Sequence, residues 1–282
     1  MPQKIIELLK QCANANFEDD FRRENLVVLP GNGDLIATGD IHGHRRNFEK
    51  IKTYADLKNH PERHLILQEI IHGGAVDEKQ NCLSYQLLFD VARYKINFPN
   101  QIHLLLSNHD TAFISNTRVL KDGKEMNASI RRALDREFKQ NSGDIKMAIA
   151  ELLFSQPLAA RCENRIWLSH SLPSDILIKK FDKSIFHRHL KVNDIVKPGS
   201  AYILAWGRKM SRQTLEKMAQ MLDVDCFILG HQPQSMGFKK AAENLLIVAS
   251  DHNHGCLLHI ELKKSYTTDE LLGALVPLAS IE

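Results

Sequence analysis

Side chains that bind metal ions recur along this chain, each shortly after a run of apolar residues. They are carboxylates, imidazoles and one amide, at Asp40, His42, Glu69, Asn108, His170 and His231. Nitrogen and oxygen ligands in this mixture suit Zn²⁺, Mn²⁺ or Fe. Two such divalent ions, held about 4 Å apart, can activate a bridging water and hold a phosphoryl group for in-line displacement. Glu69 lies between the other candidates in the sequence, so we expect it to bridge the two ions.

The first candidates lie in a motif at residues 38–44, Thr-Gly-Asp-Ile-His-Gly-His. An apolar run at 34–37 precedes the motif and predicts a buried strand, and residues 45–51 predict the first turns of a helix. Open α/β sheets place their ligands at strand-to-helix crossings of this kind. We therefore expect Asp40 and His42 to point at one ion.

Further strands and helices must position the remaining candidates. Apolar runs predict strands at residues 25–30, 64–71, 102–106, 158–161, 165–168, 225–229, 244–249 and 256–262. Helical spacing predicts helices near the N-terminus and at 45–57, 83–94 and 215–222, with a helical insert at about 116–153. Residues 177–197 follow no regular pattern, and we place Trp167 and Trp206 in the core. Together these elements predict an α/β fold with its site at the carboxyl ends of strands.

The composition is that of an ordinary soluble globular protein, with 43% hydrophobic and 25% charged residues in 282. The net charge of +3 and the lack of a Lys/Arg block argue against a nucleic-acid partner. No run approaches the roughly 20 apolar residues of a membrane span, and the first residues lack the apolar segment of a signal peptide. Five scattered cysteines fit reduced thiols in the core. We therefore expect a cytoplasmic protein.

Taken in order, five blocks of the chain resemble the signature of the calcineurin-like metallophosphoesterases, and specifically of their protein serine/threonine phosphatase branch. That signature reads G-D-x-H-G, G-D-x-x-D-R-G, G-N-H-E/D and then two later histidines. The corresponding blocks are residues 39–43, 68–74, 107–110, 168–170 and 230–232. The resemblance implies one domain over 1–282, built as a β-sandwich of mixed sheets flanked by α-helices.

Carried over residue by residue, the resemblance divides the ligands between two ions. The first ion would be held by Asp40 and His42. The second would be held by Asn108, His170 and His231. His109 would protonate the leaving alkoxide, which is worth ~10²–10⁴ in rate, and Asp110 beside it is assigned to the same catalytic group.

Three departures from the family in the second block concern positions with a chemical role. Glu69 stands where the family has Asp, so the bridging oxygens move outward by about one bond length. His72 matches the Asp that orients the catalytic His, and Gly73 matches an Arg that clamps phosphate, so a bidentate contact is lost. A rival alignment restores the second Asp as Asp77 but loses the bridge. We prefer the alignment through Glu69, because the predicted strand ends at the right place.

Other side chains could take over the contact with phosphate. Arg45 follows the first ligands and either binds phosphate or belongs to an exposed helix face. Arg208 or Arg212 could match the family's second phosphate-binding Arg by position. His254, in a polar segment at the end of a strand, either lines the pocket or belongs to a turn. We assign Arg45, Arg208 and His254 to substrate binding.

The main hypothesis is a metal-dependent phosphatase that hydrolyses a phosphomonoester, with a phosphoprotein as one possible substrate. Within the same chemistry, a small phosphometabolite or a dinucleoside polyphosphate is the rival substrate. The altered second block also allows a degenerate phosphatase that binds a phosphorylated partner without turnover. A structural metal domain is the third alternative. The sequence leaves the identity of the metals and the oligomeric state open.

Overall fold

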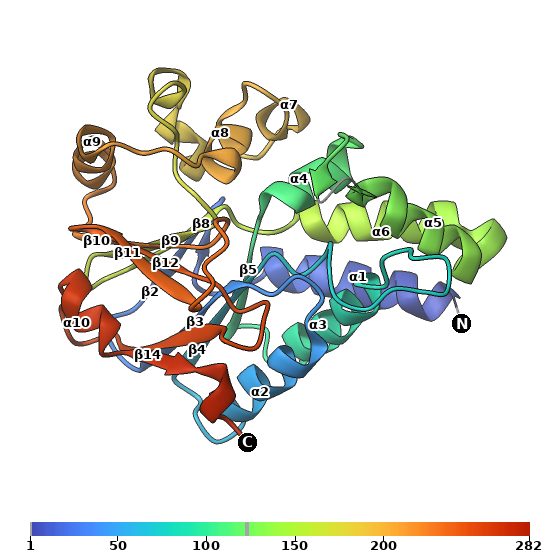
Figure 1. The fold of residues 1–282 in the computed structure, drawn as a ribbon, viewed down its shortest axis with the longest axis horizontal. Helices are drawn as coiled ribbons and strands as arrows, with labels where there is room; N and C mark the ends of the chain where they lie inside the picture. Colours follow the sequence, from blue (N-terminus) through green and yellow to red (C-terminus); the bar gives the residue numbers. More distant parts are fainter. Residues whose placement is uncertain (1, 122–123) are drawn as a thin grey trace.

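Two β-sheets packed face to face lie at the centre of the protein (Figure 1). The computed structural model describes residues 2–121 and 124–282. The five-stranded sheet has the order β14 (Leu275–Pro277), β13 (Cys256–Glu261), β3 (Asp34–Asp40), β4 (Arg63–Gln68) and β5 (Ile102–Leu105). The seven-stranded sheet has the order β1 (Arg22–Arg23), β2 (Leu26–Leu29), β8 (Ala159–Cys162), β9 (Ile166–Ser169), β10 (Cys226–Leu229), β12 (Leu245–Val248) and β11 (Phe238–Ala242).

Three neighbouring strands in each sheet run parallel. β3, β4 and β5 are parallel to one another in the first sheet, and β9, β10 and β12 are parallel in the second. Their facing sides form one buried apolar layer, with Leu35, Ile66 and Leu105 on one sheet and Leu168 and Ile228 on the other. Strands that are buried on both faces are expected to consist of continuous hydrophobic runs, and these segments do.

Helices cover the outer faces of both sheets. Those that share a core with the five-stranded sheet include α1 (Pro2–Phe17), α2 (Arg45–Ala55) and α3 (Tyr85–Asn97), with α6 (Ser142–Phe154) packed on α1 and α5 (Met126–Phe138) packed on α6. Those against the seven-stranded sheet include α7 (Val192–Ile195), α8 (Ser200–Trp206) and α9 (Arg212–Leu222). The remaining α-helices described are α4 (Asn108–Ser115) and α10 (Thr268–Leu272). The predicted β-sandwich of mixed sheets flanked by α-helices is confirmed.

Several predicted boundaries are wrong. The strand predicted at 64–71 ends at Gln68, because Glu69 turns the chain with a φ of 50°. The insert predicted as helical over 116–153 first forms a short hairpin of β6 (Leu120–Lys121) and β7 (Lys124–Glu125), and its helices begin at Met126. Residues 122 and 123 of this prediction lie outside the described residues. The sequence does not predict helix α8 or strands β11 and β14, because α8 and β14 are short and β11 is an edge strand without an apolar run.

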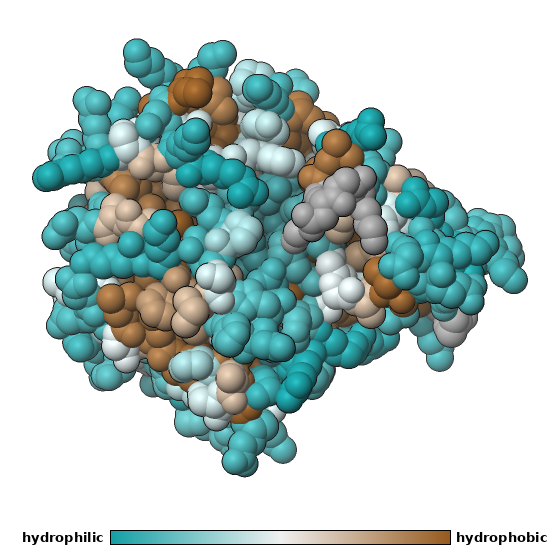
Figure 2. Space-filling view, in the orientation of Figure 1, coloured by the Kyte–Doolittle hydropathy of each residue, from teal (hydrophilic) through white to brown (hydrophobic). Residues whose placement is uncertain are grey.

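The exterior is polar and the cysteines are internal. All five cysteines are buried and form no disulfide, as predicted. On the face drawn in Figure 2, hydrophilic residues prevail and hydrophobic ones form separate patches between them. Within the described ranges, no helix has the length and apolar character needed to cross a membrane.

A buried ion pair joins the helices to the amino-terminal ends of β4 and β5. Lys95 of α3 lies fully inside, and its Nζ donates to Asp19 Oδ2 at 3.2 Å and to the Ile102 carbonyl at 2.7 Å. His103 Nδ1 lies 2.8 Å from the same Asp19 oxygen, and His64 Nδ1 lies 3.1 Å from His103 Nε2. The buried carboxylate is therefore neutralised by a cation of the protein itself.

The substitution Lys95→Met should destabilise the protein by roughly 3–5 kcal/mol, because it leaves the Asp19 carboxylate buried without its cation. Urea unfolding measures the change. The matched control is Lys10→Met, which alters an exposed lysine of α1 and should stay within about 0.5 kcal/mol of wild type. Equal stability of the two variants would show that this ion pair does not hold the helical layer in place.

Candidate metal centre

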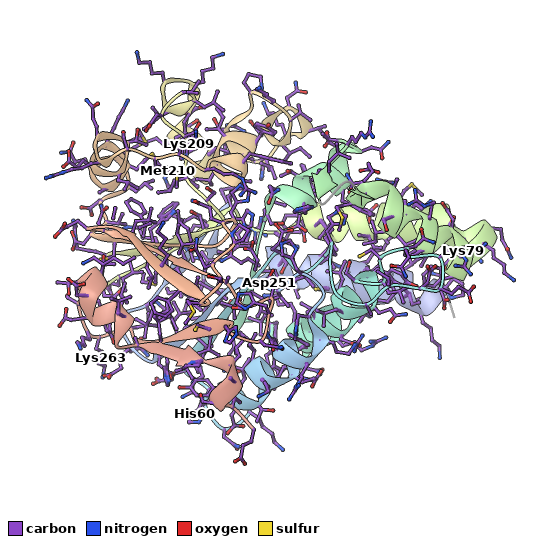
Figure 3. All side chains as sticks on the ribbon, in the orientation of Figure 1. His60, Lys79, Lys209, Met210, Asp251 and Lys263 are labelled. Atoms are coloured by element: carbon purple, nitrogen blue, oxygen red, sulfur yellow. The ribbon has the colours of Figure 1, made fainter. Side chains whose placement is uncertain are left out.

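The candidate ligands come together because each follows the end of a parallel strand. Asp40 ends β3, Glu69 follows β4, Asn108 begins α4 beyond β5, His170 follows β9, and His231 lies two residues beyond β10. Parallel strands of one sheet deliver their carboxyl ends to the same edge, and a bridge between Asp40 and Ala249 joins the two sheets there. Asp251, which follows β12, lies near the centre of the view in Figure 3.

The tightest group of donors surrounds Nε2 of His170. Asn108 Oδ1 lies 2.7 Å from this nitrogen, and His231 Nδ1 and Glu69 Oε2 each lie 3.1 Å from it. His231 Nδ1 and Asn108 Oδ1 are 3.0 Å apart. Ligands at about 2.1 Å from a divalent ion are themselves about 3.0–3.4 Å apart. The spacing and chemistry of this set therefore fit a divalent cation.

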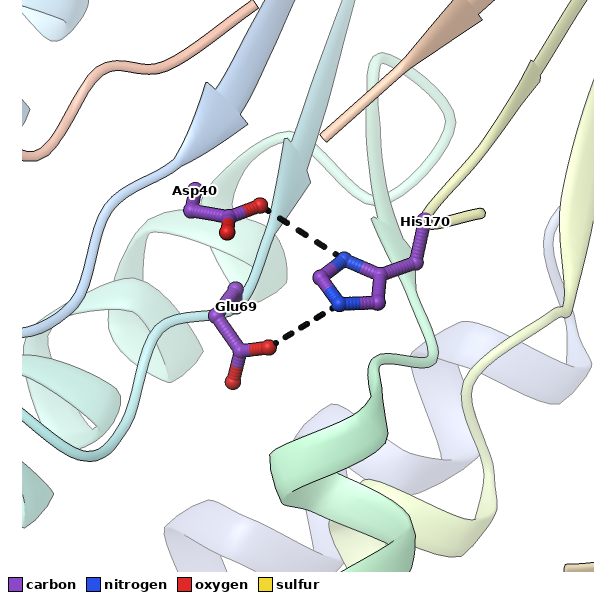
Figure 4. A group of neighbouring side chains, drawn as sticks. All are labelled: Asp40, Glu69 and His170. Atoms are coloured by element: carbon purple, nitrogen blue, oxygen red, sulfur yellow. Dashed lines mark ion pairs between the residues drawn. The ribbon is translucent and has the colours of Figure 1, made fainter. Parts of the chain in front are cut away.

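A second group of donors lies around Asp40. Asp40 Oδ2 is 3.8 Å from His42 Nε2, and Asp40 Oδ1 is 3.6 Å from His170 Nδ1 (Figure 4). Ligand atoms of Asp40, Glu69 and His170 all lie within 4.8 Å of one another. Glu69 therefore lies near both groups of donors.

The electrostatics of the site favour positive charge. Burial, and then the nearby charge of Glu69, raises the pKa of Asp40 to about 6. The same two causes raise the pKa of Asp110 to about 7. Burial also lowers the pKa of His170, so that its ring stays neutral. Several buried carboxyl groups among neutral imidazoles are costly without a cation, and such perturbed groups cluster at functional sites.

The backbone is strained where the ligands are attached. The φ angles of His42, Glu69, His72 and His231 are 45°, 50°, 68° and 66°, a region that residues with a side chain rarely adopt. Next to His231, a Cβ atom on Gly230 would lie 2.3 Å from Asp40 Oδ1, so a larger residue there would displace the carboxylate. Strain of this kind is usually concentrated at functional sites, where the surrounding structure maintains it.

Three further candidates lie behind the ligands. The ring of His109 lies 5.5 Å from the ring of His42 and 4.8 Å from that of His72. Asp110 Oδ2 accepts from the backbone N–H of Ser107, and Ser107 Oγ accepts from that of Asp110, which completes a capping box at the start of α4. Ser107 thus stands at the family's glycine position for a structural reason, and Asp110 helps to position Asn108 and His109.

The donors open into a cleft of about 320 Å³. Besides candidate ligands, its lining includes Leu120, Trp206, Arg208 and Asp251. Trp167 is buried as predicted, but the assignment of Trp206 to the core is wrong: it lines the cleft, and its Nε1 donates to Thr111 Oγ1. Sequence reasoning also missed Asp251, although it follows an apolar strand just as the candidate ligands do.

Two residues assigned to substrate binding lie elsewhere. Arg45 is exposed and forms an ion pair with Asp90, which draws its guanidinium along the helix surface. His254 is exposed, and its backbone N–H donates to His252 Nδ1, so it belongs to the turn and does not line the described cleft. Asp77, the rival choice in the second block, pairs with Arg136 and caps its own loop.

The fold is similar to those of solved phosphatases at low sequence identity. A protein serine/threonine phosphatase from Saccharomyces cerevisiae, described as similar to human phosphatase PP5, superposes with a TM-score of 0.67 and 14% identity, over 92% of this chain and 82% of that one. The cold-active protein-tyrosine phosphatase of a psychrophilic Shewanella species superposes with a TM-score of 0.55 and 15% identity, over 84% and 77%.

Sequence comparisons agree with the fold. None of the curated proteins matches this chain in sequence. The family model of the calcineurin-like phosphoesterases, however, matches residues 33–235, which contain every candidate metal ligand. The chain therefore belongs to the calcineurin-like phosphoesterases, a family of metal-dependent hydrolases of phosphoric esters.

Proposed function

We propose that this chain hydrolyses a phosphomonoester with two divalent ions bound where the two sheets meet. The observation that carries the proposal is the cluster of Asp40, Glu69 and His170, whose ligand atoms lie within 4.8 Å of one another, with Glu69 Oε2 3.1 Å from His170 Nε2. Asp40 and His42 would hold the first ion. Asn108, His170 and His231 would hold the second. When bound, such ions supply a water nucleophile and neutralise charge on the phosphoryl oxygens.

His109 is the group that we assign to proton donation. It is adjacent to Asn108 in the first turn of α4, lines the cleft and is buried except at that opening. A proton held on its ring can pass to the leaving oxygen as the ester bond breaks. The ring of His72 lies beside it where the family has a carboxylate, so orientation of His109 would here depend on ring packing.

Arg208 can bind the phosphoryl oxygens. It is the permanently charged cation among the described residues that line the cleft. The preceding Gly207 is held in place, because its carbonyl accepts from Ser171 Oγ and a Cβ there would lie 1.7 Å from the Leu172 carbonyl. A guanidinium placed in this way can form two charge-assisted bonds to phosphate. It would replace the arginine that the second block lacks at Gly73.

This arrangement favours turnover over binding alone. A protein that only bound phosphate would need Arg208 but would not need a proton donor next to a ligand. The solved neighbours act on phosphoserine or phosphothreonine in one case and on phosphotyrosine in another, as their names state. We therefore propose a phosphoprotein or a small phosphomonoester as substrate. The second candidate function is binding of phosphate without turnover, and the observation that favours it is the loss of the family's arginine at Gly73.

Glu69→Ala tests the bridge. Wild type should contain two ions per chain and hydrolyse p-nitrophenyl phosphate with Mn²⁺. The variant should retain one ion or fewer and lose at least about 10²-fold in kcat, because both ions share the deleted carboxylate. Elemental analysis and steady-state kinetics measure these quantities. Glu49→Ala, on the exposed face of α2, is the control. One ion and no turnover in wild type would favour the phosphate-binding protein.

Arg208→Ala tests the contact with phosphate. We expect kcat/KM to fall about 10–100-fold, since a hydrogen bond to a charged group contributes roughly 1.5–3 kcal/mol. Arg212→Ala is the matched control, because the sequence alone does not separate the two arginines and Arg212 is exposed and paired with Glu216. Loss of activity in the Arg212 variant alone would show that Arg212, and not Arg208, binds the phosphate.

Metal affinity should weaken as the pH falls below about 6. The metal-free protein binds a proton at Asp40, whose pKa is raised to about 6, and an incoming ion must displace this proton. The apparent Kd for Mn²⁺ should then rise about tenfold per pH unit below that value and stay level above it. Calorimetric titrations at pH 5 and pH 7.5 measure the difference. An affinity that does not change with pH would exclude Asp40 as a ligand.

A further inference from the structure

Gln68 occupies the position directly before the bridging carboxylate. The calcineurin-like signature has glycine there, so this side chain is an addition to the family pattern. Gln68 is the last residue of β4 and is 2% exposed. Its backbone pairs with Asp40 on β3 and with Leu105 on β5, which holds it between two neighbouring strands.

The orientation of the Gln68 amide follows from its two neighbours. Nε2 donates to the carbonyl oxygen of Thr38 at 2.9 Å, and Oε1 lies 3.1 Å from Nδ1 of His170. A backbone carbonyl can only accept, so the amide nitrogen must face Thr38 and the amide oxygen must face His170. Gln68 therefore offers an acceptor to Nδ1 of His170, which favours the tautomer with its proton on Nδ1.

This hydrogen bond determines which nitrogen of His170 is available to a metal. A neutral imidazole with its proton on Nδ1 has its lone pair on Nε2. Nε2 is the atom that lies 2.7 Å from Asn108 Oδ1 and 3.1 Å from both His231 Nδ1 and Glu69 Oε2. The lone pair is thus directed at the point where the other candidate ligands converge.

We propose that Gln68 is a positioning residue, which sets the tautomer and the ring orientation of His170 so that Nε2 binds the second ion. The inference rests on the proposed role of His170 as a ligand. Outer partners that hold a metal-binding histidine typically contribute 10–100-fold to metal affinity.

The packing around Gln68 supports this role. A Cβ atom on Gly230 would lie 3.0 Å from Gln68 Oε1 and 2.3 Å from Asp40 Oδ1, so the glycine leaves room for both side chains. The Asp40 carboxylate lies 3.6 Å from the same Nδ1 of His170 and accepts from the His231 backbone N–H. Every described acceptor near Nδ1 thus favours the same tautomer, and Gln68 makes the shortest contact.

Gln68→Met tests the proposal, because methionine has nearly the same length and offers no amide oxygen. Calorimetric titration with Mn²⁺ should show one ion bound about 10–100-fold more weakly and the other unchanged. With p-nitrophenyl phosphate, kcat at limiting Mn²⁺ should fall, KM should change little, and excess Mn²⁺ should restore activity. A general folding defect would not be restored by metal. Gln213→Met, on the exposed face of α9, is the matched control.

A second measurement does not need metal. Nitrogen-15 NMR of the metal-free wild type should show His170 as the neutral Nδ1–H tautomer, and the variant should show a mixture. An Nε2–H tautomer in wild type would overturn the inference, as would wild-type Mn²⁺ affinity in a folded Gln68→Met variant. Absence of metal binding in wild type, with the Nδ1–H tautomer present, would instead reject His170 as a ligand and with it the proposal. If the variant does not fold, the wild-type spectrum still decides the tautomer.

Discussion

The structure depends on one constraint at the place where the two sheets meet. Side-chain atoms that carry lone pairs are crowded together there. Carboxylate, amide and imidazole donors lie about as far apart as the ligands of a single ion, and most are buried. With the His170 proton on Nδ1, Nε2 adds its lone pair to the oxygen and nitrogen atoms around it. Holding such lone pairs close together in a buried site costs free energy. A cation relieves this cost, so metal binding and the stability of the strand ends are expected to be coupled.

Topology makes this crowding possible. β3 and β4 direct carboxylates to the edge of one sheet, and β9 and β10 direct imidazoles to the edge of the other. The buried apolar layer between the sheets then holds the two edges together. Because each ligand is attached next to a rigid strand, the positions of the ligands depend more on the strands than on the loops. The strained φ angles at Glu69 and His231 contribute to this arrangement, since they turn the side chains inward directly after the strands end.

Much of this was predictable from the sequence, and the failures have physical causes. Strong apolar runs followed by a ligand-type residue predicted the strands and the candidate ligands, because buried parallel strands leave that pattern. Short elements such as α8 (Ser200–Trp206) left too weak a periodicity to be recognised. The placement of Arg45 and Trp206 depends on tertiary partners, Asp90 for the arginine and Thr111 for the indole, which no local pattern contains. Likewise, the role of the Gln68 amide depends on its contact with His170, which no local pattern contains.

The two ends of the five-stranded sheet handle buried charge in opposite ways. At the amino-terminal ends of β4 and β5, Lys95 supplies a permanent cation for the Asp19 carboxylate. At the carboxyl ends, the described ion-pair partners of Asp40 and Glu69 are imidazoles, and burial keeps the ring of His170 neutral. A lysine in place of these histidines would fill the site and leave no room for an ion or a substrate. Neutral histidines instead add no charge of their own, so a removable cation can supply it, which is the condition that a metal-dependent phosphoesterase requires.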